Sequence, residues 1–310
     1  MRIAITGSSG MIGTALASRL REGGHGVYRV VRSDVHAGTS RSGTDEIAWS
    51  PTDGRIDADA FDGLDGVVNL AGANIGAQRW NDRYKQTLRA SRLDSTALVA
   101  RTIAESSRPP SVLISASGVN AYGNRGDEVL DESSPTEPGA GFLADLCRDW
   151  EAAAQPAASA ATRVVTTRSG VVLSADDGAL RKQLPLFRFG LGARMGSGRQ
   201  WLSWISLDDE VAAIEHLLAS ELSGPVNLTA PQPVTNTEFT KELGKALGRP
   251  TLLRVPAFGP RLVLGAEMAS SLLFDSLRVV PKALLDDGFE FRHATVREAL
   301  AAVVRDRKSD

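Results

Sequence analysis

A glycine-rich turn near the amino terminus constrains the fold of this chain more than any other feature. The turn reads TGSSGMIG (residues 6–13) and follows a short apolar run at residues 2–6. Residues 14–22 then place apolar side chains at helical spacing, and a second apolar run follows at residues 27–31. A strand, a tight turn, a helix and a strand within about 30 residues form a βαβ unit. The amino terminus therefore predicts the first crossover of a parallel sheet.

Each glycine of the turn has a physical role if the turn binds phosphate. Gly7 permits the tight turn out of the strand, Gly10 lets the backbone approach a pyrophosphate, and Gly13 lets the helix pack on the strand. The free amides and partial positive charge at the helix amino terminus favour an anion there. The alternative is a structural turn that uses glycine for close packing alone. The predicted phosphate-binding residues are Gly7, Ser9, Gly10, Met11, Ile12 and Gly13.

Further apolar runs alternate with helical patterns along the first half of the chain. Strands are expected at residues 66–70, 111–115 and 163–173, and helices at residues 81–106 and 141–154. Such alternation is typical of a parallel sheet with helices on both faces. The predicted fold class is therefore α/β, a Rossmann-like doubly wound parallel sheet with a smaller, mostly helical C-terminal substrate lobe.

Two regions are expected within the 310 residues. Residues 1–175 are predicted to form the Rossmann-like, NADP-binding domain, to which later segments return. Residues 176–310 are predicted to form the substrate lobe and a helical C-terminal domain. The helices of the tail are predicted to break at Pro256, Pro260 and Pro281.

The composition argues against several classes of function. The 35 basic and 37 acidic residues are spread along the chain and give a net charge of −2, so we expect neither nucleic acid nor an anionic membrane as a partner. The single cysteine, Cys147, excludes an internal disulfide and fits a reducing compartment. No apolar run reaches the roughly 18 residues of a spanning helix. The four histidines show no metal-ligand spacing. We therefore expect a soluble cytoplasmic protein without a metal site.

The end of the second predicted strand bears on the choice of cofactor. An NAD enzyme places an acidic residue there to bind the ribose hydroxyls. This chain has Arg32 followed by Ser33, and a guanidinium is suited to paired hydrogen bonds with a 2′-phosphate. We therefore expect NADP(H), bound in part by Arg32 and Ser33. In the alternative, Arg32 is a solvated cation and Asp34 binds the ribose.

Small residues follow the strand predicted at residues 66–70. Leu70, Ala71 and Gly72 would let a ribose or the nicotinamide lie against the backbone, so we predict that they contact the cofactor. The alternative is an Ala-Gly turn that packing alone requires.

Several segments taken together resemble one protein family. They are TGSSGMIG, NLAGANI, SASGVNAYG, WISLDDEVAAI and the tail segment RVVPKALLDDGFEF. The chain resembles the atypical extended short-chain dehydrogenase/reductases of the NAD-dependent epimerase/dehydratase family, in particular the epimerase family protein branch with a C-terminal domain of unknown function. The resemblance covers essentially the whole chain. It implies a Rossmann-like domain that binds NADP(H), with the C-terminal part closing over the nicotinamide end, and it implies no particular substrate.

The catalytic residues of that superfamily are matched in part. There a Ser or Thr, a Tyr and a Lys act together: the tyrosine moves a proton, and the lysine lowers the tyrosine pKa and holds the ribose. The resemblance places Ser117 at the serine position. It places Leu143 and Cys147 at the tyrosine and lysine positions, and a register shift of one residue places Phe142 and Leu146 there instead. Neither register restores the pair.

Three interpretations of the missing pair remain open. In the first, another group supplies the proton, and the candidate is Tyr122, just past Ser117 on a loop at the carboxyl end of a strand. In the second, hydride transfer alone is catalysed and water or the substrate handles the proton. In the third, the protein binds NADP(H) and reports on it without chemistry. The candidate catalytic residues are thus Ser117, with Ser115 as second choice, and Tyr122, whose alternative role is a packing or substrate-lining phenol. Cys147 is interpreted as a buried structural thiol.

Aromatic and cationic residues outside the predicted cofactor contacts would form a substrate pocket. They are Arg79, Trp80, Lys85, Arg194, Arg199, Trp201 and Trp204. Together they suit an acidic or phosphorylated small molecule, although each alone also suits the core or a solvated surface. The prediction is an NADP(H)-binding epimerase or oxidoreductase-like protein acting on an unknown small molecule, with a non-catalytic NADP(H)-binding sensor or regulatory protein as the alternative. The oligomeric state is left open.

Overall fold

The computed structural model describes residues 1–33 and 45–306. An eight-stranded sheet forms its centre, and its strands run parallel except where β4 meets β3. In spatial order the strands are β13 (Gly224–Leu228), β8 (Arg163–Ser169), β6 (Val112–Gly118), β5 (Gly66–Asn69), β1 (Arg2–Thr6), β2 (Gly26–Arg32), β3 (Glu46–Ser50) and β4 (Arg55–Ile56). The predicted Rossmann-like parallel sheet is confirmed.

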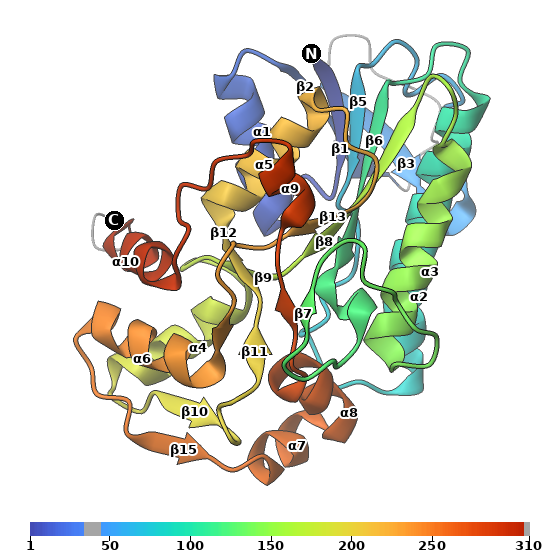
Figure 1. The fold of residues 1–310 in the computed structure, drawn as a ribbon. Helices are drawn as coiled ribbons and strands as arrows, with labels where there is room; N and C mark the ends of the chain where they lie inside the picture. Colours follow the sequence, from blue (N-terminus) through green and yellow to red (C-terminus); the bar gives the residue numbers. More distant parts are fainter. Residues whose placement is uncertain (34–44, 307–310) are drawn as a thin grey trace.

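The strand order reverses between β1 and β5. From β1 the chain runs outward through β2 and β3, and it then crosses back to β5 and continues through β6 to β8. Helices α1 (Met11–Glu22) and α5 (Leu207–Ala219) lie on one side of the sheet, and α2 (Asp82–Glu105) and α3 (Phe142–Ala154) lie on the other (Figure 1). In open α/β sheets, ligands bind at the carboxyl ends of the strands where the order reverses. The gap between β1 and β5 is therefore the place to look for a site.

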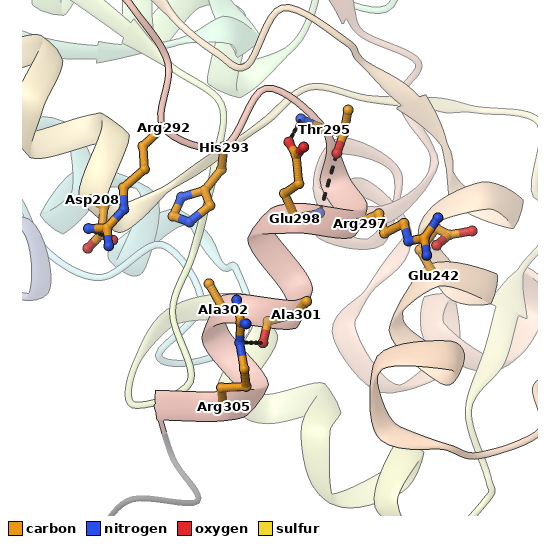
Figure 2. Close-up of a pocket in the computed structure, with 10 residues that line it drawn as sticks. All are labelled: Asp208, Glu242, Arg292, His293, Thr295, Arg297, Glu298, Ala301, Ala302 and Arg305. Carbon is orange, nitrogen blue, oxygen red and sulfur yellow. Dashed lines mark hydrogen bonds and ion pairs between the residues drawn. The ribbon is translucent and has the colours of Figure 1, made fainter.

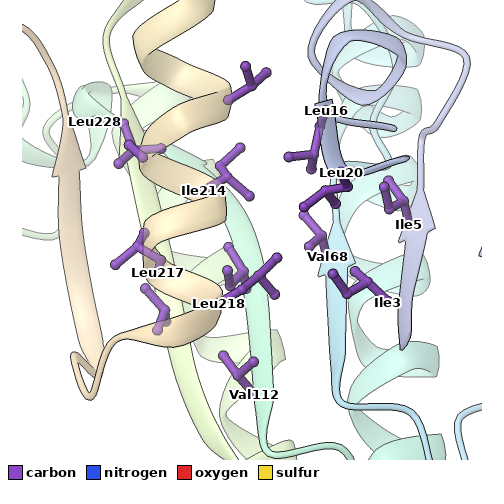
Figure 3. Packing of buried hydrophobic residues seen from close by; sticks show 14 of the residues in the cluster. Ile3, Ile5, Leu16, Leu20, Val68, Val112, Ile214, Leu217, Leu218 and Leu228 are labelled. Atoms are coloured by element: carbon purple, nitrogen blue, oxygen red, sulfur yellow. The ribbon is translucent and has the colours of Figure 1, made fainter. Parts of the chain in front are cut away.

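Apolar side chains of α1 and α5 fill the layer between these helices and the sheet (Figure 3). Leu16 and Leu20 of α1 and Ile214 and Leu218 of α5 are buried there. Each pair is separated by four residues, which places its members on one face of the helix. Burying a side chain of this size contributes about 1.5–3 kcal/mol. This layer therefore holds α1, whose amino terminus follows the glycine turn, firmly against β1.

The helices α2 and α3 begin at residues that favour a helix start. Asn81 precedes α2, and its Oδ1 atom accepts a hydrogen bond from the Tyr84 amide (2.8 Å), which satisfies a backbone donor that the helix leaves free. Gly141 precedes α3 and has φ of +116°, which favours glycine. Both helices agree with the predicted ranges to within one residue at each end.

A second region lies beyond the carboxyl ends of the sheet strands (Figure 1). Its helices are α4 (Gly178–Arg188), α6 (Asn236–Leu247), α7 (Phe258–Leu264), α8 (Ala266–Ala269) and α10 (Val296–Asp306). Helix α9 (Lys282–Asp286) instead packs beside α5 and β13, with Leu284 in the core cluster of α1 and α5 (Figure 1). Four two-stranded ladders complete the fold: β9 (Val171–Leu173) with β12 (Trp204–Ser206), β10 (Ala193–Met195) with β15 (Leu253–Val255), β11 (Trp201–Leu202) with β14 (Val234–Thr235), and β7 (Val129–Leu130) with β16 (Arg278–Val279).

Two local predictions were wrong. The single strand predicted at 163–173 is two strands, because the chain leaves the main sheet at Gly170 and β9 pairs with β12 instead. A Cβ atom at Gly170 would lie 2.7 Å from the Ser203 carbonyl oxygen, so glycine permits this change of partner. Pro260 does not break a helix but lies in the first turn of α7, where its missing amide costs nothing. None of the helices in the described part of the chain has the length and apolar character that a membrane crossing requires.

Candidate functional site

Thr6 joins the ends of β1 and β5 where the strand order reverses. Its Oγ1 atom donates a hydrogen bond to Asn69 Oδ1 (2.7 Å) and accepts bonds from the amides of Leu70 (3.1 Å) and Ala71 (3.2 Å). The next residue, Gly7, has φ of +63°, and a Cβ atom there would lie 2.7 Å from the Leu70 carbonyl oxygen. The two strand ends therefore approach too closely for any residue but glycine.

The glycine turn folds back closely on the start of α1. A Cβ atom at Gly13 would lie 2.3 Å from the Gly7 carbonyl oxygen, which explains why the helix needs glycine there. Gly10 is less crowded, with 3.4 Å to the same oxygen. Its missing side chain instead leaves the outer side of the turn open, where an approaching ligand would meet backbone.

A cleft of about 470 Å³ opens beside this turn, and a second cavity of about 460 Å³ adjoins it. Arg32, Trp49, Thr87 and Ser91 line both spaces. The walls of the cleft come from residues 7–10 of the turn, residues 29–32 of β2, residues 70–73 after β5, Trp49 of β3, and Thr87 and Ser91 of α2. Segments far apart in the sequence thus meet at one place beside the reversal point.

Most of the predicted cofactor residues lie in these two spaces. Met11, Ile12 and Gly13 line neither, because they form the first turn of α1. The Ile12 side chain packs on the core beneath, and the Met11 side chain lies near Gly178 at the start of α4. Asp34, the alternative ribose ligand, lies outside the described residues. Of the predicted cofactor residues, Ser33 lines the adjoining cavity, and the following line the cleft: Gly7, Ser9, Gly10, Arg32, Leu70, Ala71 and Gly72.

Two guanidinium groups line the cleft. Arg29 Nε donates a hydrogen bond to Ser8 Oγ (3.2 Å), and its Nη1 atom lies 3.7 Å from Glu46 Oε1. Among the described residues no carboxylate pairs with Arg32, which is exposed. Sequence reasoning found Arg32 and missed Arg29, although a cation inside an apolar strand was a usable signal. The cleft therefore carries positive charge next to the free backbone of the glycine turn.

Buried polar side chains beneath the cleft form hydrogen bonds with one another and with the backbone after β5. Asn69 Nδ2 and Trp150 Nε1 both donate to Thr96 Oγ1, each at 2.8 Å. The Arg92 guanidinium lies 5.0 Å from the Trp150 ring centroid and donates to the Ala73 carbonyl oxygen (3.1 Å). Burial lowers the pKa of Arg92. These contacts fix the backbone of the segment after β5 from behind.

Ser117 is part of a buried ion-pair cluster. Its Oγ atom donates to Glu151 Oε1 (2.8 Å). Arg168 holds the same carboxylate through two hydrogen bonds, from Nε and from Nη2, both 2.8 Å long. This bidentate arrangement is strong and geometrically specific. The hydroxyl of Ser117 is thus bonded inside the protein, and Ser117 does not line the cleft.

Tyr122, the predicted proton donor, is also buried. Its hydroxyl donates to Asn227 Oδ1 (2.8 Å), and the Arg168 guanidinium lies 4.7 Å from the ring centroid. Burial raises the pKa of Tyr122. The phenol is buried in a small apolar cluster with Leu130 and Val279, away from the residues that line the cleft. Its contacts fit the alternative role, a packing phenol, and a catalytic role for it stays a prediction.

The residues at the expected tyrosine and lysine positions pack in the interior. Leu143 is buried in a cluster with Trp80, Tyr84 and Met268. Cys147 is buried, and burial raises the pKa of its thiol to about 11. The thiol is therefore neutral at pH 7, as the interpretation of a structural cysteine requires.

The aromatic and cationic residues predicted to form a substrate pocket do not come together. Trp80 and Trp204 are buried in different clusters. Lys85 forms an ion pair with Glu267. Trp201 Nε1 bonds to Asp127, and its ring lies 4.2 Å from the Arg278 guanidinium. The exposed residues Arg79, Arg194 and Arg199 line none of the described pockets.

A larger, open pocket of about 1010 Å³ lies along α10 (Figure 2). Its charged groups are largely engaged locally. Arg292 pairs with Asp208 (3.2 Å), Glu298 accepts from the Thr295 amide (3.0 Å), and Arg305 bonds to the Ala301 carbonyl oxygen (3.2 Å). The pocket mixes both signs of charge and shares no residue with the cleft. The smaller cleft at the reversal point is therefore the better candidate.

The sheet order, the glycine turn and the position of the cleft define a Rossmann-like nucleotide-binding fold. The particular family follows from sequence comparison. The chain belongs to the NAD dependent epimerase/dehydratase family, whose model matches residues 3–228. Residues 255–303 match a second model, described as a domain of unknown function (DUF1731). The family and the C-terminal domain expected from the sequence are thus confirmed.

Similar proteins share nearly the whole chain. An epimerase family protein of Mycobacterium leprae is 47% identical over 96% of this chain and 94% of its own length. The epimerase family protein SDR39U1 of Mus musculus is 38% identical over 98% of this chain and 100% of its own. The crystal structure of human SDR39U1 (isoform 2) with NADPH has 33% sequence identity and a TM-score of 0.88, and the match covers 99% of this chain and 100% of that one.

Proposed function

We propose that the cleft at the reversal point binds NADP(H). The observation that carries this proposal is the presence of two guanidinium groups, Arg29 and Arg32, on one cleft beside the glycine turn. A 2′-phosphate between them accepts charge-assisted hydrogen bonds from both. The NADPH in the structure of the human relative supports the same choice.

The residues present fit such a dinucleotide. Gly7 and Gly10 leave no side chain between the turn and a pyrophosphate, and the start of α1 favours its charge. Arg32 and Trp49 line both spaces, so the adenosine half lies on the side of β2 and β3. The other half of the dinucleotide is then directed across the reversal point, toward the carboxyl ends of β5 and β6.

Calorimetric titration with NADPH tests the proposal. We expect Arg32→Ala and Arg29→Ala each to weaken NADPH binding roughly 10- to 100-fold, the loss of one charge-assisted hydrogen bond. The affinity for NADH, which lacks the 2′-phosphate, should change much less. Arg21→Ala, an exposed arginine of α1 outside the cleft, is the matched control and should bind both nucleotides as the unmodified protein does. Equal losses for NADPH and NADH in Arg32→Ala would contradict the proposed contact.

We propose further that the bound cofactor serves an oxidoreductase or epimerase-like reaction on a small molecule. NADP(H) supplies a hydride in such chemistry, and the protein must position the substrate and move the proton. The second candidate is a non-catalytic NADP(H) sensor. It is favoured by the burial of the Ser117 and Tyr122 hydroxyls, both of which are bonded within the protein. Turnover of NADPH with any carbonyl compound supports the first candidate, and binding without turnover across a broad panel supports the second.

A further inference from the structure

A small cavity lies at the carboxyl end of β6, outside the polar cluster described above. It has a volume of about 10 Å³, which is close to the minimum that one water molecule needs. Three polar side chains line it together with the apolar Leu143 and small residues. The three are Asn120, just past β6, and Ser271 and Asp275, from the π-helical turn Ser270–Phe274 and the residue after it.

These three side chains have no partner in the described part of the chain. The hydrogen bonds of Asn120 and Asp275 in that part involve backbone atoms, from the Gly123 amide to the Asn120 carbonyl and from the Asp275 amide to the Ser270 carbonyl. The side chains of Asn120, Ser271 and Asp275 form neither a hydrogen bond nor an ion pair with a described residue. Ser117 and Tyr122, on the same stretch of chain, are fully engaged. Polar groups that converge on a cavity without partners are free to bind a ligand.

The cavity lies on the side of the sheet toward which the proposed cofactor extends. β6 pairs with β5, whose carboxyl end forms one wall of the cofactor cleft. The adenosine half lies over β2 and β3, so the reactive half lies over β5 and β6. The C-terminal region supplies two of the three side chains and thereby closes this end of the site.

We propose that Asn120, Ser271 and Asp275 form a subsite that binds the reacting oxygen of the substrate next to the nicotinamide. In this subsite the Asp275 carboxyl group accepts or donates the proton of the reaction. This inference rests on the proposed NADP(H) site. In the direction of oxidation, the carboxylate takes the proton of a substrate hydroxyl while the carbon beside that oxygen gives its hydride to the oxidised nicotinamide. A carbonyl, a protonated Asp275 and the reduced cofactor result. Reduction follows the same steps in reverse, so atoms and electrons balance in both directions. Asn120 and Ser271 hold the oxygen by hydrogen bonds.

The subsite also constrains the substrate. Of the described residues that line the cavity, Asp275 alone has an ionisable side chain, and it is half-buried. Burial raises the pKa of Asp275, and an anionic group beside it would be repelled. The reacting end of the substrate is therefore an uncharged alcohol or carbonyl group. An acidic group, if the substrate has one, must bind elsewhere.

A test that does not need turnover uses the charge of the nicotinamide ring. The ring is positive in NADP⁺ and neutral in NADPH. We expect the pKa of Asp275, followed by carbon-detected NMR of its carboxyl group, to be lower in the NADP⁺ complex than in the NADPH complex. Asp275→Asn assigns the resonance. Identical pKa values in the two saturated complexes would overturn the placement of Asp275 beside the ring.

A second test compares two neighbouring serines. With NADPH and the neutral diketone diacetyl, we expect Asp275→Asn to lower the turnover roughly 100-fold, as is typical for loss of a general acid–base group. Ser271→Ala should lower it less. Ser270→Ala is the matched control, because Ser270 lies in the same turn and does not line the cavity; it should leave the rate unchanged. Pyruvate, which is anionic and of similar size, should react more slowly than diacetyl. Unchanged turnover in Asp275→Asn would overturn the catalytic role.

The two proposals fail in different ways. If NADPH does not bind the unmodified protein, the proposed function is wrong, and the subsite has no cofactor to act with. If NADPH binds equally well to the unmodified protein and to Asp275→Asn, the cofactor site stands. The NMR and turnover results for Asp275 then decide the subsite alone.

Discussion

Two regions at the carboxyl ends of the sheet strands differ in whether their charged side chains have partners within the protein. At β1, β2 and β5, Arg32 is exposed beside an open cleft without a carboxylate partner among the described residues. At β6 and β8, the buried Arg168 forms a bidentate pair with Glu151 of α3, which is largely buried, and Ser117 adds a third hydrogen bond. The first half presents Arg32 to a ligand, whereas in the second half Ser117, Glu151 and Arg168 are bonded to one another.

This difference indicates that the half with Arg32 binds a ligand and that the half with Arg168 contributes to folding stability. A cation such as Arg32, exposed beside the glycine backbone, suits a phosphate, and its removal should change ligand affinity more than folding stability. Breaking a buried ion pair should instead lower folding stability more than ligand affinity, because it leaves a desolvated charge unpaired. The candidates chosen from sequence for catalysis, Ser117 and Tyr122, lie in the second kind of environment. The following predictions test that division, beginning with the largest expected effect.

Removing one partner of the buried pair should cost the most stability. We expect Arg168→Met to lower the free energy of unfolding by about 3–5 kcal/mol, because the Glu151 carboxylate remains buried without its cation. Urea denaturation measures this loss. The matched control is Arg89→Met: Arg89 pairs with Asp149 at the surface, so its loss should cost less than about 1 kcal/mol. A loss below about 1 kcal/mol for Arg168→Met would show that the Glu151–Arg168 pair contributes little to folding stability.

The pH dependence of stability should reveal a second buried group in the same half. Glu210, in the first turn of α5, accepts a hydrogen bond from Ser169 (2.7 Å), and its Oε2 atom is buried without a partner among residues 1–33 and 45–306. Burial raises the pKa of Glu210 to about 8 from its ordinary value of 4.5. The folded protein therefore keeps a proton here that the unfolded chain releases. The stability that this proton contributes is complete below about pH 4.5 and is lost as pH rises toward about 8.

Glu210→Gln removes this titration while it keeps a neutral side chain of similar shape. Between about pH 5 and 8, the unfolding free energy of the unmodified protein should fall relative to that of Glu210→Gln by up to about 1.4 kcal/mol per pH unit. Urea denaturation at several pH values measures the difference. Parallel pH profiles for the two proteins would show that Glu210 is ionised in the folded state.

The smallest effects are expected for the two hydroxyls. Ser117→Ala and Tyr122→Phe each remove one internal hydrogen bond and should lower the free energy of unfolding by about 1 kcal/mol. Neither should alter NADPH affinity, because neither side chain lines the cleft. If Tyr122→Phe folds normally but has lost NADPH turnover, Tyr122 is the proton donor after all. The proposed difference between the two halves of the sheet would then be wrong.

The strands, the main helices and the glycine turn could be predicted from sequence because they depend on neighbouring residues. A Cβ atom at Gly13 would meet the Gly7 carbonyl oxygen within the same turn, and Gly7 has φ of +63° there, although the close contact at Gly7 comes from the distant Leu70. Arg32 could be found because it stands at the end of a strand whose role was already clear. The main sheet could be predicted from these local patterns together with the known handedness of parallel crossovers.

The rest of the site depends on contacts between distant segments. Trp49 reaches the cleft from β3, and Thr87 reaches it from α2. Tyr122 is buried because Asn227 and Arg168 meet it from two other strands. Asp275 reaches its cavity from the C-terminal region, and nothing in its own segment marks it as a partner of Asn120. Such placement requires the fold itself, which local sequence patterns do not provide.

The most direct test of the central claim is a calorimetric comparison of NADPH with NADH on the unmodified protein. We expect NADPH to bind at least about tenfold more tightly than NADH, because a phosphate bound by a guanidinium gains at least one charge-assisted hydrogen bond. The preference should decrease with rising salt, since Arg32 is exposed. Equal affinities for the two nucleotides, or no heat with either at millimolar concentration, would contradict it.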